Sequence, residues 1–470
     1  MRDVSCDVAV IGAGTAGIAA HAAATQAGAR AVLIERGPGG TTCARVGCMP
    51  SKLLIAAARA ARGAEESGLF GIDVPRVHVD GRAVMRRVRR ERDHFVASVR
   101  EGVDSLPRED RIGGTARFAD ATTLLVDDHT RITARAVVVA AGSSPSVPPP
   151  LEPVADRVLT TDTIFEIEDL PESVAVLGAG PVGLELAQAL SRLGVRVALF
   201  DPSSVVAGLE DPEIAAEAAR LIGRDLDLRL GTEVTGAEPE ADAVRLHWRD
   251  GDGRTGTEVF ARVLAAAGRP PNLTPLDLGR TGLDLDEHGL PDFNPRSLQC
   301  GSSPIFLAGD VNHERPVLHE ASRQGTIAGG NAASYPHVEA PALWPAYSLV
   351  YTEPEIAVVG RTFDGEAAGG WIIGSVSLDD QGRARVMGRN AGQIRLYADP
   401  GDGRLIGGAM VGPEAEHLSH LLAIAVQEGW SAERMLDRPF YHPTVEEGLQ
   451  SALKAVAKET ARRRAAPALR

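Results

Sequence analysis

Residues 6–35 have the sequence CDVAVIGAGTAGIAAHAAATQAGARAVLIE, which predicts a buried strand, a glycine-rich turn, a helix and a second strand. Residues 174–201, VAVLGAGPVGLELAQALSRLGVRVALFD, repeat the same order. In both stretches an acidic residue follows the first glycine at the same spacing, from Gly12 to Glu35 and from Gly178 to Asp201. A unit of this kind that occurs twice predicts an α/β fold with two Rossmann-like domains.

Each glycine-rich turn has the pattern GxGxxG, in which every glycine has a physical reason. The first allows the tight turn from strand to helix, the second lets the backbone approach a pyrophosphate, and the third lets the helix pack closely on the strand. The helix N-terminus adds N–H donors for the anion. Because each turn also has its strands, helix and distal carboxylate, we expect both to bind dinucleotides. The glycines are Gly12, Gly14 and Gly17 in the first unit and Gly178, Gly180 and Gly183 in the second.

The distal carboxylates indicate which dinucleotide the second unit binds. Glu35 and Asp201 are each expected to accept a hydrogen bond from a ribose 2′-hydroxyl. A 2′-phosphate would instead require arginines just after the second strand, where residues 202–205 are Pro-Ser-Ser-Val. We therefore expect NAD rather than NADP in the second unit.

A third distinctive stretch is GGTTCARVGCMPSK, residues 39–52. Cys43 and Cys48 are five positions apart, which on a regular helix is a rise of about 7.5 Å with the side chains on different faces. A disulfide needs Cα atoms within roughly 4.4–6.8 Å, so the loop must depart from a helix, and Gly47 has the freedom for that. Pro50 and the apolar run after it favour a helix start, whose dipole would stabilise a nearby thiolate.

Spacing leaves three interpretations of this cysteine pair: a redox-active disulfide, two buried free thiols, or ligands of a metal. A zinc site is disfavoured because no histidine or further cysteine lies at ligand spacing, and we predict no metal site. Cys6, which opens a predicted core strand, and Cys300, in a loop before a strand, are interpreted as structural.

The composition is that of an ordinary globular protein, with 470 residues of which 44% are hydrophobic and 24% charged. The net charge of −14 argues against nucleic acid or an anionic membrane as the main partner. No apolar run approaches the ~20 residues of a membrane span, and the N-terminal residues carry no targeting signal. We expect a cytoplasmic location.

Further patterns indicate domain boundaries. The run SVPPPLEP, residues 146–153, is typical of a connection between domains, and GRPPN, residues 268–272, predicts a second crossover. After Ala346, alternating strands and Gly/Asp turns favour an α+β domain with an antiparallel sheet. The predicted domains are 1–150 together with 270–345, then 151–269, then 346–460, followed by a disordered tail at 461–470.

The basic run 82–92 could be a patch for polyanions, but its apolar residues recur at helical spacing. This spacing predicts a helix whose arginines lie on a solvated face. The predicted apolar face is Val84, Val88, Phe95 and Val99.

Over nearly its whole length the chain resembles the pyridine nucleotide-disulfide oxidoreductases, and most closely the dihydrolipoamide dehydrogenases. The family pattern of GGTC, four residues, then CxPSK matches from Gly40 to Lys52, with Thr41 in place of a usual glycine. Further family motifs follow in order along the chain. They are AAGSSP (140–145), GRPPN (268–272), FLAGD (306–310), YTEPE (351–355) and YHPTVEE (441–447).

The resemblance implies two cofactors. The first glycine motif, in the domain of residues 1–150 and 270–345, would bind FAD, with Asp310 at its ribityl chain. The second motif, in residues 151–269, would bind the nicotinamide cofactor. Further cofactor contacts are expected at Arg36, Thr42, Gly142 and Gly268.

The resemblance also implies how the redox pair works. Cys48, nearer the flavin, would be the charge-transfer thiolate, and Cys43 would exchange with the substrate disulfide. Lys52 would lie beside the flavin N5 and pair with Glu185. The composition singles out this lysine independently, because the chain has only three lysines, and a compact, tunable charge suits such a position. The alternative for Lys52 is an exposed helix lysine.

Thiol–disulfide exchange also needs a proton acceptor. The resemblance implies that His442 is this base, oriented by Glu447, and that the pair faces the other subunit's cysteines across the interface of a homodimer. Phe440 and Glu446 depart from the family pattern on the substrate side of this pair, where a histidine and a small hydroxyl residue are usual. His319 falls where the family has a histidine near the flavin.

The predicted reaction passes electrons between a dithiol or disulfide and NAD(H) through FAD and the Cys43–Cys48 pair. The expected substrate is dihydrolipoamide or lipoamide, free or on a separate lipoyl protein. One alternative is an NAD(P)H-dependent reductase of another low-molecular-weight disulfide or of quinones. Mercuric reductases would carry a further cysteine pair after Cys300. A non-catalytic flavoprotein is the remaining alternative, and it would be expected to lack the redox cysteines or the base pair.

Overall fold

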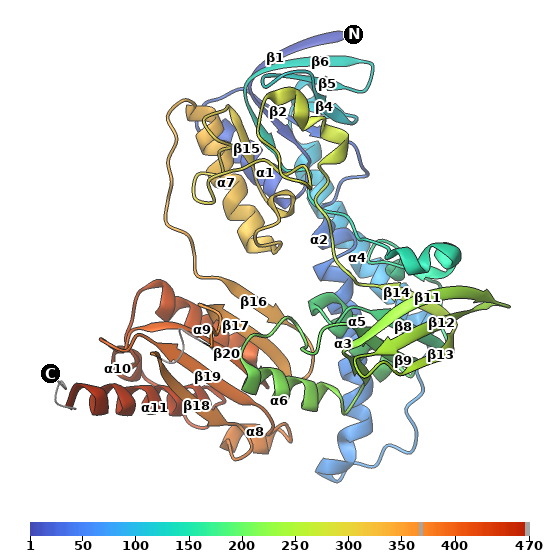
Figure 1. Cartoon of the computed structure of the whole chain (residues 1–470), viewed down its shortest axis with the longest axis vertical. Coiled ribbons are helices and arrows are strands. Elements are labelled where there is room, and N and C mark those ends of the chain that lie inside the picture. The colour runs from blue at the N-terminus through green and yellow to red at the C-terminus, as the bar shows by residue number, and fades with distance from the viewer. Residues whose placement is uncertain (366–369, 466–470) are drawn as a thin grey trace.

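The computed structural model describes residues 1–365 and 370–465. Its first unit, at the top of Figure 1, is a sheet in the order β3-β2-β1-β6-β5-β4, with β15 beside β6. The central strands are parallel, whereas β4 and β5 are antiparallel to their neighbours. The strands are β1 (Arg2–Ile11), β2 (Ala31–Glu35), β3 (Arg111–Gly113), β4 (Ala116–Phe118), β5 (Thr123–Val126), β6 (Thr130–Val139) and β15 (Ile305–Leu307).

Helices α1 (Thr15–Gln26) and α7 (Leu318–Ser334) pack on this sheet and against each other. Their close approach depends on small residues, because a Cβ on Gly329 would lie 2.1 Å from the carbonyl oxygen of Ala20. Both β15 and α7 come from the segment after residue 300, so the chain returns to the first sheet after building the second unit.

The second unit repeats the first. Its sheet has the order β10-β9-β8-β14-β7 with all pairs parallel. A smaller antiparallel sheet, β11-β12-β13, packs beside it, and the proline-rich run at residue 149 forms a 3-10 helix. The elements are β7 (Val158–Leu159), β8 (Ser173–Leu177), α5 (Pro181–Arg192), β9 (Arg196–Asp201), α6 (Pro212–Ile222), β10 (Asp227–Leu230), β11 (Thr232–Glu240), β12 (Ala243–Asp250), β13 (Thr255–Phe260) and β14 (Arg262–Ala265).

The third unit, at the lower left of Figure 1, is an antiparallel sheet covered by helices, in the order β16-β17-β20-β19-β18. This confirms the predicted fold class, two parallel dinucleotide-type units followed by an antiparallel α+β unit. The elements are β16 (Tyr347–Val350), β17 (Glu355–Gly360), β18 (Ile372–Ser377), α8 (Gly382–Val386), β19 (Gln393–Ala398), β20 (Leu405–Gly412), α9 (Ala415–Gln427), α10 (Ala432–Leu436) and α11 (Glu446–Ala465).

Helices α2 (Thr42–Arg45), α3 (Cys48–Glu65) and α4 (Gly81–Asp104) extend from the first unit toward the other two (Figure 1). The apolar face of α3, with Leu54, Ile55 and Ala58, lies in one core with the apolar face of α5. The segment that contains Cys43 and Cys48 is therefore held between the two dinucleotide-type units.

The structure corrects the predicted face of α4. Phe95 is 36% exposed, whereas Arg92, predicted to be solvated, is only 6% exposed. The buried positions are Gly81, Met85, Val88, Arg92 and Val96. Arg92 can be buried because it is paired with carboxylates, which a hydropathy pattern does not reveal.

The structure also corrects the predicted disordered tail, because residues 461–465 continue α11. Glu459 forms ion pairs with Arg462 and Arg463, one helical turn later. Arg463 also donates hydrogen bonds to the carbonyl oxygens of Gly370 and Trp371, beside β18. These contacts fix the last turn, and the remainder of the predicted tail, 466–470, lies outside the described residues.

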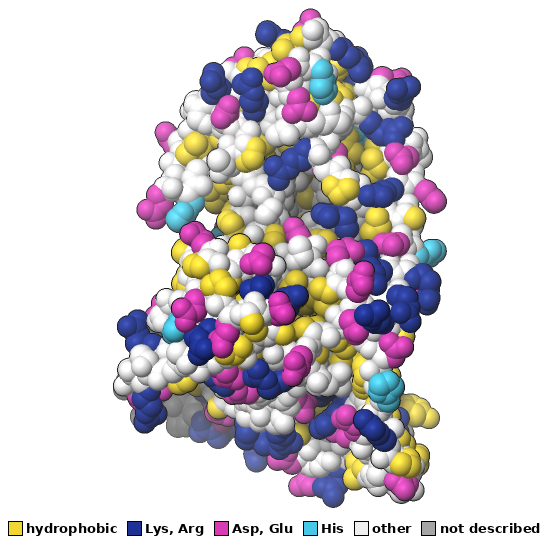
Figure 2. Space-filling view, turned by 90° about the vertical axis from the view of Figure 1, so that its right-hand side faces the viewer, with side chains coloured by type: hydrophobic (Ala, Val, Ile, Leu, Met, Phe, Trp, Pro, Cys, Tyr) yellow, Lys and Arg dark blue, Asp and Glu magenta, His cyan; other side chains and the backbone are white. Residues whose placement is uncertain are grey.

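Basic and acidic side chains are interspersed over the face shown in Figure 2. Among the helices described, none is long and apolar enough to cross a membrane.

Candidate active site

The first glycine turn is built on close backbone contacts. Gly12 has φ +103°, and a Cβ there would lie 2.3 Å from the carbonyl oxygen of Ala140 on the neighbouring strand. A Cβ on Gly17 would lie 1.7 Å from the carbonyl oxygen of Gly12. At Gly14, by contrast, no described protein atom lies within 4 Å of the Cβ position. The first and third glycines are thus required by the fold, and the second leaves room for a ligand against the backbone.

The second turn has the same geometry. Gly178 has φ +113°, and a Cβ there would lie 2.4 Å from the carbonyl oxygen of Ala266. A Cβ on Gly183 would lie 1.9 Å from the carbonyl oxygen of Gly178, whereas one on Gly180 would meet no described atom within 4 Å.

The two distal carboxylates also occupy equivalent positions. Glu35 accepts a hydrogen bond of 2.7 Å from the N–H of Ala13, inside the first glycine motif. Asp201 accepts one of 2.5 Å from Ala179 in the second. Each carboxylate thereby lies at the end of its second strand and beside the glycine turn.

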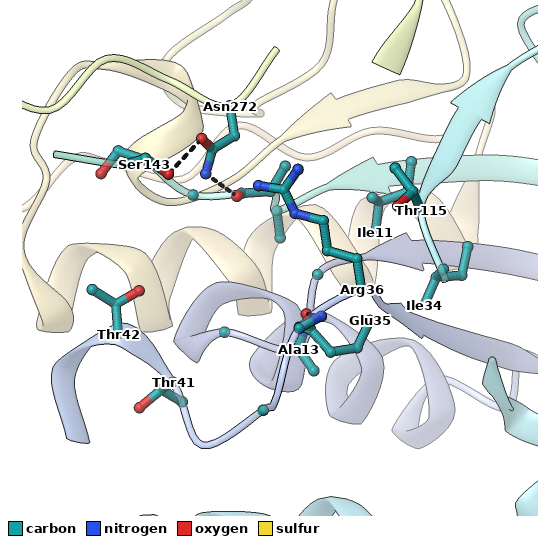
Figure 3. A pocket seen from close by; sticks show the side chains of 18 of the residues that line it. Ile11, Ala13, Ile34, Glu35, Arg36, Thr41, Thr42, Thr115, Ser143 and Asn272 are labelled. Carbon is teal, nitrogen blue, oxygen red and sulfur yellow. Dashed lines mark hydrogen bonds between the residues drawn. The ribbon is translucent and has the colours of Figure 1, made fainter. Parts of the chain in front are cut away.

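A cleft of about 200 Å³, open to solvent, lies beside the first glycine turn. Figure 3 shows that Glu35 and Arg36 lie on one side of it and that Thr41 and Thr42 lie beside the same glycine turn. Asp310 accepts a hydrogen bond of 3.0 Å from the hydroxyl of Ser143, a residue that also lines the cleft.

Ser143, Asn272 and Thr115 also line the cleft, and none of them was among the residues predicted from the sequence. Ser143 follows Gly142 in the AAGSSP motif, and Asn272 ends the GRPPN motif that contains Gly268, so both motifs contained the signal. The amide of Asn272 donates to the carbonyl oxygen of Ala141 (Figure 3), which ties the two motifs together. No motif marks Thr115.

The redox loop departs from a helix between α2 and α3, as the spacing required. The break allows a close approach, because a Cβ on Gly47 would lie 3.0 Å from the carbonyl oxygen of Thr42 and 3.2 Å from the Cα of Cys43. Thr41, in place of the family's glycine, has φ +56°, and its hydroxyl accepts a hydrogen bond from the N–H of Ala44. This cap offsets part of the cost of the left-handed backbone at a non-glycine residue.

Cys43 and Cys48 carry free thiols that contact each other. A hydrogen bond from Cys43 and the ammonium of Lys52 lower the pKa of Cys48 to about 7, against the opposing effect of burial. The same contact, together with burial, raises the pKa of Cys43. The pair therefore has one thiol that ionises near neutral pH and one that stays protonated.

The two other cysteines behave differently. Burial raises the pKa of Cys6 and of Cys300 to about 12. Both are buried in the core of the first unit and keep their protons at neutral pH, as expected of structural cysteines.

Lys52 and Glu185 come together across the two dinucleotide-type units, with 2.6 Å between Nζ and Oε2. The ammonium also lies 4.6 Å from the ring centre of Tyr351, whose N–H donates to the other oxygen of Glu185 at 3.0 Å. Lys52 is thus not a free surface lysine, because its ammonium is held beside the redox pair.

His442 and Glu447 form a second pair, with Nδ1 of the imidazole 3.0 and 3.1 Å from the two carboxylate oxygens. Hydrogen bonds from His442 and from the N–H of Thr444 lower the pKa of Glu447. His442 is 80% exposed. No contact among the described residues joins it to the cysteines of its own chain.

Three further residues, His319, Phe440 and Glu446, were singled out by the resemblance to the family. His319 lies on α7, half-buried, with its ring centre 6.0 Å from that of Tyr347, and burial lowers its pKa. Phe440 packs against the core of the third unit, and Glu446 begins α11.

The family comparison agrees with this geometry. Residues 6–325 match the family model described as pyridine nucleotide-disulphide oxidoreductase, and residues 346–453 match the dimerisation domain of the same family. The chain belongs to this family. Its members are flavoprotein disulfide oxidoreductases that use FAD and NAD(H), and the dimerisation domain supports a homodimer.

The relatives of this chain differ from one another in activity. The chain is 29% identical to a dihydrolipoyl dehydrogenase of Haloarcula marismortui, over 96% of this chain and 97% of that one. It is 32% identical to a mercuric reductase of Shigella flexneri, over 96% of this chain and 81% of that one. The flavoprotein disulfide reductase RclA of Escherichia coli, in a Cu(II) complex, has a TM-score of 0.83 at 21% identity, covering 96% and 99% of the two chains, which shows a shared fold.

The residues around the first glycine turn fit FAD. The absence of a side chain at Gly14 leaves open space beside the backbone, where a pyrophosphate would lie. Glu35 is in place for a ribose, and Arg36 and Arg45 bring positive charge to the same cleft. The second turn offers the same open space at Gly180, with Asp201 as its carboxylate.

Because these two spaces are unobstructed by protein, valine substitutions there should separate the two cofactors. Gly14→Val should fold but lower flavin affinity about ten- to a hundredfold, the effect of one overpacked contact. Gly180→Val is the matched control and should keep its flavin while binding NADH more weakly. Flavin absorbance per protein would measure the flavin content of each variant, and thermal melting would show whether each variant folds. Loss of flavin from both variants, or from neither, would contradict the assignment.

The cysteine pKa values predict a pH dependence of thiol reactivity in the reduced protein. A pKa lowered to about 7 means that the Cys48 thiolate is present above pH 7 and is lost as the pH falls below it. Alkylation of the Cys43–Cys48 pair should therefore rise about tenfold per unit up to about pH 7 and then level off. Mass spectrometry would locate the label. Equal labelling of Cys6 or Cys300 at neutral pH would contradict this prediction.

Proposed function

We propose that this chain is a dihydrolipoyl dehydrogenase that passes electrons between dihydrolipoamide and NAD(H) through its redox cysteines and FAD. The observation that carries the proposal is the thiol pair itself. Cys48 has a pKa near 7 and lies beside a lysine that is held by a buried carboxylate, Glu185. A low-pKa thiolate next to a second, protonated thiol is the arrangement that disulfide exchange requires.

The proposed exchange begins with the oxidised Cys43–Cys48 disulfide. A substrate thiolate attacks Cys43, which forms a mixed disulfide and releases Cys48 as a thiolate, and a leaving thiol of low pKa departs fastest. The second substrate thiol gives its proton to His442 and attacks the mixed disulfide, which releases the substrate disulfide and leaves Cys43 to take a proton. The substrate has then lost two electrons and two protons.

FAD, when bound, supplies hydride transfer to the nicotinamide, so the sum is dithiol plus NAD⁺ giving disulfide, NADH and a proton. Lys52 holds positive charge beside the redox thiolate throughout. Glu185 keeps the lysine in place.

We propose NAD rather than NADP for the second unit. Asp201 carries a negative charge where a 2′-phosphate would lie, and residues 202–205 contain no arginine that would compensate for it. A cytoplasmic location accords with the use of NAD(H) and of reducible cysteines.

The base of the exchange is proposed to come from the other subunit. His442 is exposed and oriented by Glu447, yet within its own chain no described contact connects it to the cysteines. A homodimer that places it against the partner's redox pair would complete two equal sites.

A second candidate is a reductase of another disulfide, or of quinones. Phe440 stands where a dihydrolipoyl dehydrogenase usually has a histidine, and Glu446 where a small hydroxyl residue is usual. The mercuric reductase among the relatives shows that a family member of similar identity can carry another activity.

The first test of the function is NADH oxidation by the purified flavoprotein with lipoamide, compared with glutathione disulfide, cystine and a quinone. Lipoamide should be turned over fastest, and Cys48→Ser should reduce this activity at least about a thousandfold because the pair acts as a unit. Cys300→Ala is the matched control and should keep full activity. Turnover of quinone alone, unaffected by Cys48→Ser, would refute the proposal.

Mixed dimers test the shared site. Subunits carrying Cys43→Ser and subunits carrying His442→Gln should each be nearly inactive as homodimers. A mixed dimer, purified with two different tags, should recover about half of the wild-type activity, since one of its sites combines the intact cysteines with the intact histidine. If cysteines and base belonged to one subunit, the mixed dimer would stay inactive.

A further inference from the structure

Arg92 is an unusual residue in the middle of an exposed, arginine-rich helix. Its side chain is 7% exposed, whereas that of Arg90, two positions earlier, is 71% exposed. Arginine is almost never buried without partners. The partners of Arg92 therefore indicate why the chain keeps a guanidinium at this position.

The guanidinium of Arg92 donates a hydrogen bond to the segment that contains Cys43. Nη1 donates to the carbonyl oxygen of Arg45 at 3.3 Å and to Glu166 at 2.6 Å. Nε donates to Asp93 at 2.6 Å. Arg45 is the last residue of α2, so its carbonyl has no following helical turn to supply a donor. Arg92 satisfies this carbonyl and places a positive charge at the C-terminal end of the short helix that contains Cys43.

The same face of α4 also contacts the beginning of the loop. Val96 is one turn beyond Arg92, and a Cβ on Gly40 would lie 2.8 Å from its Cγ1. Gly40 has φ +87°, and it precedes α2 by two residues. Helix α4 thus touches the redox loop on both sides of Cys43, through a packing contact before it and a hydrogen bond after it.

We propose that Arg92 is a positioning residue of the redox site, held by Glu166 so that its guanidinium fixes the carbonyl of Arg45 and thereby the distance between Cys43 and Cys48. This inference rests on the proposed role of the two cysteines as the redox pair. It adds that the geometry of the pair is set from outside the loop, by α4.

We expect Arg92 to influence the hydrogen bond between the thiols of Cys43 and Cys48. The charged groups that act on Cys48 are Lys52 and Glu185, and neither touches α4 through a described contact. The hydrogen bond from Cys43 is the larger influence on the Cys48 pKa. When Arg92 is removed, α2 can shift relative to α3, the hydrogen bond between the thiols weakens, and Cys48 ionises at higher pH.

The experiment uses the reduced flavin-loaded enzyme and the pH profile for alkylation of the Cys43–Cys48 pair by iodoacetamide. In Arg92→Met the midpoint should rise by about one unit. Turnover of lipoamide should fall about tenfold with its KM nearly unchanged, because misplaced reacting groups affect the chemical step. Arg90→Met is the matched control, since it removes an equal charge from the same helix, and it should leave both quantities unchanged.

A purely structural role for Arg92 would lower the melting temperature and leave the alkylation midpoint in place, and this result would overturn the proposal. If Arg92→Met does not fold, Arg92→Lys decides, because the shorter lysine lacks the planar fork that bonds Asp93, both oxygens of Glu166 and the Arg45 carbonyl at once. An unchanged midpoint in Arg92→Lys would overturn the proposal equally. Alkylation does not depend on the substrate, so activity that survives Cys48→Ser would refute the proposed function separately.

Discussion

One buried carboxylate, Glu185, joins all three units of the molecule. It is 5% exposed and lies on α5, two residues after the third glycine of the second motif. One of its oxygens pairs with Lys52 on the redox helix, and the other accepts the N–H of Tyr351 from the third unit. A buried carboxylate is costly unless such partners satisfy it. This carboxylate therefore helps to set the relative placement of the two glycine turns and the cysteine pair, together with the apolar core shared by α3 and α5.

The duplicated unit shows how one local rule can give two different sites. The same steric limit applies in both turns. A Cβ on Gly17 would lie 1.7 Å from the carbonyl oxygen of the first glycine of its motif, and a Cβ on Gly183 would lie 1.9 Å from the equivalent oxygen. The difference between them arises from their neighbours. The first turn shares a cleft with the redox loop and with Arg36. The second is followed by residues 202–205, which are uncharged.

The sequence was sufficient for the features that depend on local spacing, and insufficient for those that depend on long-range pairing. Both nucleotide turns, the antiparallel unit and the break in the redox loop follow from spacing and residue type. The burial of Arg92 and the helical course of residues 461–465 do not, because each depends on partners that are distant or outside the hydropathy pattern, such as Glu166 and the carbonyl of Gly370. The contact between Lys52 and Glu185 was predictable only from the resemblance to the family, since spacing contains no information about it.

The asymmetry of the two thiols follows from where the redox loop departs from a helix. The break at Gly47 makes Cys48 the first residue of α3, an 18-residue helix, whose N-terminal dipole favours a negative charge. Lys52 is four residues later and so lies on the same face of the helix, one turn away. Cys43 lies before the break, in the four-residue helix α2, where the hydrogen bond with Cys48 and burial raise its pKa despite the charge of Lys52. A loop that is continuous in sequence thus gives two identical side chains different chemistry, because Cys48 begins a long helix and accepts the hydrogen bond that Cys43 donates.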